Sequence, residues 1–124
     1  MVFDGRLESA AASAARRPSL PVADGFELDL AGRVLRHGSE PVHLRPIEFR
    51  LLAALAGAPG RAFTRRQLLE TAWPSRQPVD LRTVDVHVHW LRSKIEREPS
   101  RPTYLVTVRG YGYRLDPPGA LTVP

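Results

Sequence analysis

The most regular hydrophobic pattern in the chain lies within residues 80–97. Four aliphatic side chains recur there at helical spacing and fall on one narrow stripe: Val84, Val88, Leu91 and Ile95. The pattern predicts a helix that buries this stripe. Asp80 can cap its first turn, because a carboxylate there accepts from backbone N–H groups without helical partners. Pro99 predicts its end.

The opposite face of this predicted helix is rich in hydrogen-bond donors. It carries Arg82, Val86, His89 and Ser93, with Asp85 and Arg92 on one shoulder and Trp90 and Arg97 on the other. Such a face is either an ordinary solvated surface or the outer side of a helix that enters a DNA major groove. The helix pattern alone does not decide between these two interpretations.

Two shorter amphipathic segments come before this helix. The first starts at Pro46, which suits the first position of a helix, and its apolar stripe stops at Gly57. That stripe consists of Ile47, Leu51, Leu52 and Leu55. The second spans residues 64–73 and opens with a capping box formed by Thr64 and Gln67. A proline-rich loop then leads to the long helix, as in a helix-turn-helix.

Alternating segments before the helices predict three or four short antiparallel strands. These segments are residues 26–30, 33–38 and 41–44. Phe26, Leu28 and Leu30 are expected to face inward together. Val34 and the stem of Arg36 are expected at the alternate positions of the next strand.

After the helices, residues 105–109 and 113–115 predict a β-hairpin. Gly110 and Gly112 are expected to supply the unusual backbone geometry of its turn. A hairpin beside a DNA-reading helix is a wing. Arg109 at its tip could enter a minor groove, whose negative potential attracts arginine.

Composition narrows the function classes. The 124 residues suffice for one domain with its own core, and the absence of cysteine excludes disulfides and thiolate metal sites. The sequence has neither a secretory signal nor an apolar run long enough to span a membrane, so a cytoplasmic location is expected. The net charge of +5 points to an anionic partner. Four of these five excess charges lie between Arg82 and Arg114, which coincides with the predicted reading helix and wing.

Catalytic and cofactor motifs are not found in the sequence, so an enzyme is not expected and no cofactor is predicted. His87 and His89 form a His-x-His pair, but on a helix they point about 200° apart and cannot share one metal ion. The two glycines around Tyr111 lack the third glycine and the helix of a dinucleotide fingerprint. No metal site is predicted.

The chain divides into three expected parts. Residues 1–21 are interpreted as a tail or linker, 22–117 as the folded domain and 118–124 as a C-terminal tail. Residues 2–17 are also similar to the last helix of a receiver domain. This similarity predicts that the chain is the C-terminal half of a longer regulator.

Three segments in order carry a family resemblance: LRPIEFRLLAALAGAPGRAFTRRQLLETAW, RTVDVHVHWLRSKIE and TVRGYGYRL. With them, residues 26–115 resemble the winged-helix effector domain of OmpR/PhoB-type response regulators. The resemblance implies an α+β winged helix-turn-helix with an N-terminal four-stranded antiparallel sheet, a three-helix bundle and a C-terminal hairpin. It implies a two-component transcription regulator that binds double-stranded DNA in a sequence-specific manner.

The resemblance also implies roles for individual residues. Arg82, His87, His89 and Thr107 would contact phosphates, Val86 and Arg92 would contact base edges, and Arg109 would serve the wing. The complete predicted DNA-contacting set is Arg82, Val86, His87, His89, Trp90, Arg92, Lys94, Thr107, Arg109 and Tyr111. The loop predicted to touch RNA polymerase comprises Trp73, Pro74, Ser75, Arg76, Gln77 and Pro78.

Two positions depart from the family pattern. Members usually have Thr or Ser where Arg45 stands, so the cap of the first long helix is expected to be weaker by about 1 kcal/mol. Members often have Arg where Trp90 stands. Trp90 could pack against thymine methyl groups or sugar edges, or it could cover the shoulder of the core.

The resemblance also suggests partners. The chain is expected to be a monomer in solution that pairs head to tail on direct-repeat DNA, with RNA polymerase and an upstream receiver domain as further partners. The alternative function is a winged helix whose exposed face docks a protein, such as polymerase or a fused domain, with little DNA specificity.

Overall fold

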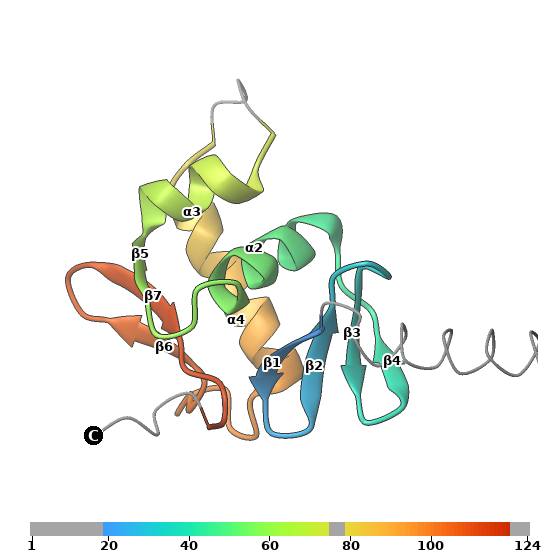
Figure 1. Ribbon diagram of the computed structural model, residues 1–124. Helices are drawn as coiled ribbons and strands as arrows, with labels where there is room; N and C mark the ends of the chain where they lie inside the picture. Colours follow the sequence, from blue (N-terminus) through green and yellow to red (C-terminus); the bar gives the residue numbers. More distant parts are fainter. Residues whose placement is uncertain (1–18, 75–78, 120–124) are drawn as a thin grey trace, which may run out of the picture.

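The computed structural model of the protein describes residues 19–74 and 79–119. In chain order, the elements of these residues are β1 (Ser19–Ala23), β2 (Phe26–Asp29), β3 (Val34–His37), β4 (Glu40–Val42), α2 (Pro46–Ala56), β5 (Ala62–Thr64), α3 (Arg65–Ala72), α4 (Arg82–Ile95), β6 (Leu105–Val108) and β7 (Gly112–Leu115). Figure 1 shows the three helices between the four-stranded sheet of β1 to β4 and the smaller sheet of β5, β6 and β7.

The N-terminal sheet is antiparallel and has the order β1-β2-β3-β4. Its first strand begins at Ser19. The boundary predicted between the tail and the folded domain, at residue 22, therefore lies too far along the chain. Pro21 made this segment look like a linker. A proline is tolerated on an edge strand because its missing N–H need not pair, and β1 is such an edge.

The inward face of β3 differs from the expected one. Leu35 is fully buried, whereas Val34 is half-buried and Arg36 is exposed. The register explains this difference, because Leu35 lies opposite Leu28 of β2 and paired residues point to the same face. The expected facing of Leu28 is confirmed, since its side chain is fully buried.

The three helices lie where the hydrophobic pattern predicts them. In α4 the predicted stripe is buried, and in α2 the buried aliphatic residues include Leu51, Leu52 and Leu55. The capping box of α3 is confirmed: the Gln67 N–H donates to Thr64 Oγ1 at 3.0 Å, and the Thr64 N–H donates to Gln67 Oε1 at 2.9 Å. Side chains from all three helices and both sheets join in one hydrophobic cluster.

The start of α2 is stabilised despite the unusual Arg45. Arg45 provides no side-chain cap, but the carboxylate of Glu48 accepts its backbone N–H at 2.7 Å. The same carboxylate accepts Lys94 Nζ of α4 at 2.6 Å and is fully buried. One buried acid therefore both closes the first turn of α2 and joins α2 to α4.

The wing is part of a three-stranded sheet with the order β5-β7-β6, not an isolated hairpin. Gly110 has a φ of 73° and supplies the left-handed turn geometry that was predicted. Gly112 does not have a positive φ and is the first residue of β7, which corrects its predicted role. A Cβ on Gly112 would collide with the Phe63 carbonyl oxygen, so this glycine is needed because β5 passes very close to it.

The end of α4 is tied to the start of the wing by a second buried acid. The Glu96 carboxylate accepts the backbone N–H groups of Thr103, Tyr104 and Leu105 at 2.7, 2.9 and 2.7 Å. This contact fixes where β6 leaves the helix. It therefore sets the position of the wing relative to α4.

Candidate nucleic-acid interface

The N-terminal end of α4 presents an exposed cation. The Arg82 side chain is 87% exposed, and its Nη2 lies 2.8 Å from Asp80 Oδ2. The other Asp80 oxygen accepts the Arg82 backbone N–H at 2.9 Å, so the predicted capping carboxylate serves this turn although α4 itself starts two residues later. The hydrogen bonds from Arg82 lower the pKa of Asp80. A charged Asp80 thus orients Arg82 without removing it from solvent.

The outer face of α4 is exposed along its length, as predicted. Val86 is 44% exposed, and His89 and Ser93 are exposed beside it. The Ser93 hydroxyl donates to the His89 carbonyl at 3.1 Å, which satisfies it within the helix. Val86 therefore leaves an apolar spot within a polar face, and such a spot suits contact with a base methyl group.

One shoulder of α4 is bound to the wing through Arg92. Its Nε donates to the Leu105 carbonyl at 2.8 Å, and its Nη2 donates to Thr107 Oγ1 at 2.9 Å. Burial lowers the pKa of the guanidinium. The sequence assigned Arg92 to a base and Thr107 to a phosphate. The structure adds that these two side chains hold each other, which the sequence did not indicate.

Asp85 is a junction that sequence reasoning did not single out. Its Oδ1 accepts Arg65 Nε of α3 at 2.7 Å and the Tyr113 hydroxyl of β7 at 2.5 Å. The Arg65 guanidinium also lies over the Tyr113 ring, 5.2 Å from its centroid. The hydrogen bond to Asp85 raises the pKa of Arg65. Asp85 therefore joins two helices and the wing through one carboxylate.

The wing tip presents the groups that the sequence predicted. Arg109 and Gly110 are exposed, and Tyr111 is 46% exposed. The Tyr111 N–H donates to the Val108 carbonyl at 2.9 Å, which closes the turn. A cation and an aromatic ring thus project together from the tip.

The other shoulder of α4 carries a line of rings. His87 lies edge-on to Trp73 at 5.0 Å and to Trp90 at 4.8 Å between centroids. His87 Nδ1 lies 2.8 Å from the Thr83 carbonyl, which can only accept, so Nδ1 carries a proton. The Arg45 guanidinium lies over the Trp90 ring, 4.4 Å from its centroid. Trp90 is therefore partly buried and packs against side chains from the start of α2 and from α4.

Lys94 is turned away from the outer face. Its ammonium group donates to Glu48 at 2.6 Å and to the His43 carbonyl at 2.8 Å, and its side chain is 23% exposed. The sequence assigned Lys94 to DNA. In the structure these two hydrogen bonds use the ammonium to bind α4 to the start of α2.

The predicted polymerase-contacting loop is described only at its start. Trp73 is half-buried against His87, and Pro74 is exposed. Ser75, Arg76, Gln77 and Pro78 lie outside the described residues.

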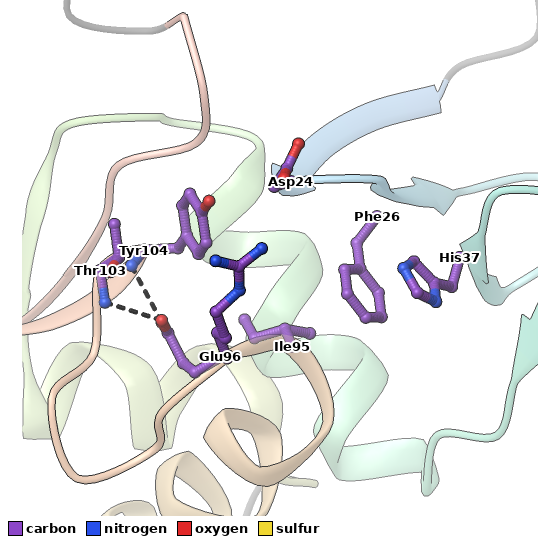
Figure 2. A pocket seen from close by; sticks show the side chains of 8 residues that line it. Asp24, Phe26, His37, Ile95, Glu96, Thr103 and Tyr104 are labelled. Carbon is purple, nitrogen blue, oxygen red and sulfur yellow. Dashed lines mark hydrogen bonds between the residues drawn. The ribbon is translucent and has the colours of Figure 1, made fainter.

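A groove lies near the far end of α4, between the β1–β2 turn and the segment that leads into the wing. Its volume is about 490 Å³. Figure 2 shows the Phe26 and His37 rings stacked on one side of it, with centroids 4.2 Å apart, and Tyr104 on the other. The carboxylate of Glu96 in this groove is already bonded to three backbone N–H groups. Glu96 is therefore already satisfied within the protein, while Asp24, His37 and Arg97 also line the groove.

Two other kinds of feature are missing from the described part of the chain. Its helices include none that is long and apolar enough to cross a membrane. Across residues 19–74 and 79–119, no cluster of three or more His, Cys, Asp or Glu side chains is placed to hold a metal ion.

The order of elements, the exposed helix α4 and the adjoining hairpin define a winged helix-turn-helix domain of the α+β class. Comparison with known proteins then places the chain more narrowly. Residues 39–115 match the family described as transcriptional regulatory protein, C terminal. The chain belongs to this family, and its resemblance to OmpR/PhoB-type response regulators is confirmed.

Among curated proteins, the chain is similar to the DNA-binding response regulator MtrA of Mycobacterium tuberculosis (strain ATCC 25618 / H37Rv). The two are 46% identical over 99 residues, which cover 80% of this chain and 43% of MtrA. The chain thus spans less than half the length of this relative.

Two solved structures show the same fold. The response regulator DrrB of Thermotoga maritima, an OmpR/PhoB homologue, matches with a TM-score of 0.69 and 36% identity over 74% of this chain and 42% of DrrB. The DNA-binding domain of RstA from Klebsiella pneumoniae, solved in complex with the RstA box, matches with a TM-score of 0.67 and 29% identity over 80% of this chain and 97% of that domain.

Proposed function

We propose that this chain is the effector domain of a transcription regulator and binds double-stranded DNA in a sequence-specific manner. The exposed face of α4 supports this most directly, because the buried stripe on the opposite face fixes its orientation and the wing borders it. A helix of this kind fits the major groove of B-DNA, which is about 12 Å wide. The wing tip then lies beside the helix, where a neighbouring minor groove would run.

The proposed DNA-contacting side chains differ in the part of the DNA that each one suits. Arg82 and His89 are exposed on α4 and suit phosphate oxygens, which fix the docking but carry no sequence information. Val86 offers an apolar contact to a thymine methyl group. Arg109 at the wing tip suits a narrow minor groove, where the potential is most negative. We leave Lys94 out of this set, because its ammonium binds Glu48 and His43.

The net positive charge of the protein supports an anionic partner. The protein has a net charge of +5, and most of the excess lies from Arg82 onward. Binding of a basic surface to DNA releases cations condensed on the phosphates. This release is less favourable at higher salt concentration, so the affinity falls as salt is added.

Several further properties extend this proposal to the regulator as a whole. We infer pairing of two copies on direct-repeat sites, with half-sites about one helical turn apart. Contact of the residue 73–78 loop with RNA polymerase, control by a receiver domain and a cytoplasmic location are proposed on the same grounds, by analogy with relatives named as response regulators.

A salt series on two kinds of duplex tests this function. A randomised-duplex selection with the chain first gives a preferred site, and binding to that site and to a scrambled duplex is then titrated between about 50 and 200 mM salt. We expect a preferred site, tighter binding to it at every salt concentration, and a log-log slope of about −0.9 for every phosphate neutralised. Selection without an enriched motif, together with a flat salt response, would contradict DNA recognition and favour a protein-docking role.

A further inference from the structure

Arg45 lies on the shoulder of α4 although it belongs to the start of α2. Its guanidinium sits over the Trp90 ring, 4.4 Å from the centroid, and its side chain is 54% exposed. A guanidinium stacked on an indole is held in one orientation and keeps its edge free to donate. Trp90 therefore acts as a platform that carries a cation from another helix.

The platform itself is fixed by its neighbours. The His87 ring contacts Trp90 edge-on. It also makes an edge contact with Trp73 at the end of α3. His87 is in turn held by the Thr83 carbonyl. Because the rings support one another, less side-chain freedom would remain to be lost when Arg45 binds a partner.

The charges around Arg45 leave it available to such a partner. The nearby acid is Glu48, whose carboxylate takes Lys94 Nζ at 2.6 Å but Arg45 Nη1 only at 3.4 Å. Glu48 is fully buried, so it cannot follow Arg45 outward. Lys94 is thus the closer counter-charge of Glu48, and the exposed edge of Arg45 adds a positive charge to the shoulder.

The position of Trp90 on α4 indicates which part of a bound DNA the Arg45 guanidinium would face. At about 100° per residue, Trp90 lies about 60° from Ser93 of the exposed face, on the side toward α2. The sugar-phosphate strands border both sides of a helix in the major groove. A cation on this shoulder therefore faces a strand, not the base edges.

We propose that Arg45 binds a DNA phosphate from the α2 side of the reading helix, with Trp90 as its platform. This inference rests on the DNA-binding function proposed above. It makes the start of α2 a direct contributor to the interface, opposite the wing. An exposed guanidinium suits a phosphate because it can donate two parallel hydrogen bonds.

The salt dependence of binding tests this contact. We expect Arg45→Gln, on the preferred duplex, to lower affinity several-fold at low salt and to reduce the log-log slope by about 0.9, the value for one phosphate. Arg45→Lys should keep the slope, because it keeps the charge. Arg36→Gln is the matched control: it removes the same charge from an exposed position on β3, away from α4, and should leave the slope unchanged.

A second comparison tests the platform. In a Trp90→Leu background, Arg45→Gln should change the slope by clearly less than about 0.9, because the guanidinium is no longer held in place. The fold should survive Arg45→Gln, since the backbone N–H of this position still donates to Glu48. Thermal unfolding of each variant checks this.

The outcomes separate the two proposals. If the parent chain binds with the expected salt slope and Arg45→Gln leaves that slope unchanged, the role of Arg45 is wrong while DNA binding stands. If the parent itself shows no preferred site and no salt dependence, the proposed function fails and this contact fails with it.

Discussion

The Tyr113 hydroxyl of β7 donates a 2.5 Å hydrogen bond to the Asp85 carboxylate of α4, so the wing is fastened directly to the helix it accompanies. Arg65 of α3 shares the same carboxylate oxygen. The orientation of α4 relative to the wing therefore depends on a polar contact as well as on the core.

Removal of this hydroxyl should weaken the fold. We expect Tyr113→Phe to lower the free energy of unfolding by about 1 to 2 kcal/mol, because Asp85 loses a nearly buried donor. Burial and the hydrogen bond to Asp85 raise the pKa of Tyr113, so the folded state holds this proton more tightly than the unfolded state. Stability should therefore fall as the pH rises above about 10, the ordinary pKa of tyrosine, and Tyr113→Phe should lack this component.

Urea unfolding of the parent and the Tyr113→Phe variant, from neutral pH to about one unit above the ordinary tyrosine pKa, measures this effect. Tyr111→Phe is the matched control, because Tyr111 is exposed at the wing tip. Equal pH profiles for the parent and Tyr113→Phe would contradict the role assigned to this hydroxyl.

Glu48→Gln should be strongly destabilising. The parent carboxylate is fully buried, accepts the Arg45 N–H and pairs with Lys94. Because loss of one partner leaves the other charge without compensation, we expect a loss of about 3 kcal/mol. Chemical denaturation measures it, with Glu70→Gln on the exposed side of α3 as the control. A loss no larger than that of the control would show that Lys94 finds another partner.

The two glycines of the wing should respond differently to alanine. Gly110→Ala places a side chain at a positive φ in open space and should cost about 1 kcal/mol. Gly112→Ala drives a Cβ into the Phe63 carbonyl oxygen, so β5 and β7 must separate and the cost should be clearly larger. Amide hydrogen exchange of residues 62–64 should rise in Gly112→Ala only. Equal stability losses in the two variants would contradict this account of β5.

Arg92→Ala should weaken specific DNA binding and relax the preference at one base position. A good bidentate base contact is worth about 1 to 3 kcal/mol of discrimination. Thr107→Val is the companion variant, because it removes one contact of the guanidinium with the wing and leaves the charge in place. Randomised-site selection compares the three proteins. An unchanged motif in Arg92→Ala, with only an even loss of affinity, would limit Arg92 to holding the wing.

Trp90 should report DNA binding by its fluorescence. Its ring is partly buried beneath Arg45, so a phosphate drawn to Arg45 changes the environment of the indole. In a Trp73→Phe background, which leaves a single tryptophan, emission should shift or be quenched on addition of the preferred duplex. A scrambled duplex at higher salt is the control. Emission that the preferred duplex leaves unchanged would make Trp90 a packing residue only.

Much of the fold followed from local patterns. The 3.6-residue stripe of α4, the Thr64–Gln67 capping box and the turn at Gly110 depend on residues close together in the chain, so the sequence alone determined them. The same holds for the exposed face of α4, because burying one stripe of a helix places the opposite residues outside.

Strand pairing and register were decided only by the tertiary structure. β5 has only three residues and β1 contains a proline, so their own residues predict little. Both become strands because a neighbouring strand offers unpaired N–H and C=O groups. Leu35 faces inward because Leu28 stands opposite it. Such pairings join separate segments, and an alternating pattern fixes neither partner nor register.

At the candidate interface, Arg45 and Trp90 show most clearly what the sequence determined and what only the tertiary structure decided. The sequence marked both as departures from the family pattern, one as a weak helix cap and the other as a lost base contact. Only the packing of α2 against α4 brings residues so far apart in the chain into one stacked pair. Contacts of this kind depend on the three-dimensional arrangement of whole helices, whereas the sequence by itself determined which face of each helix was available to make them.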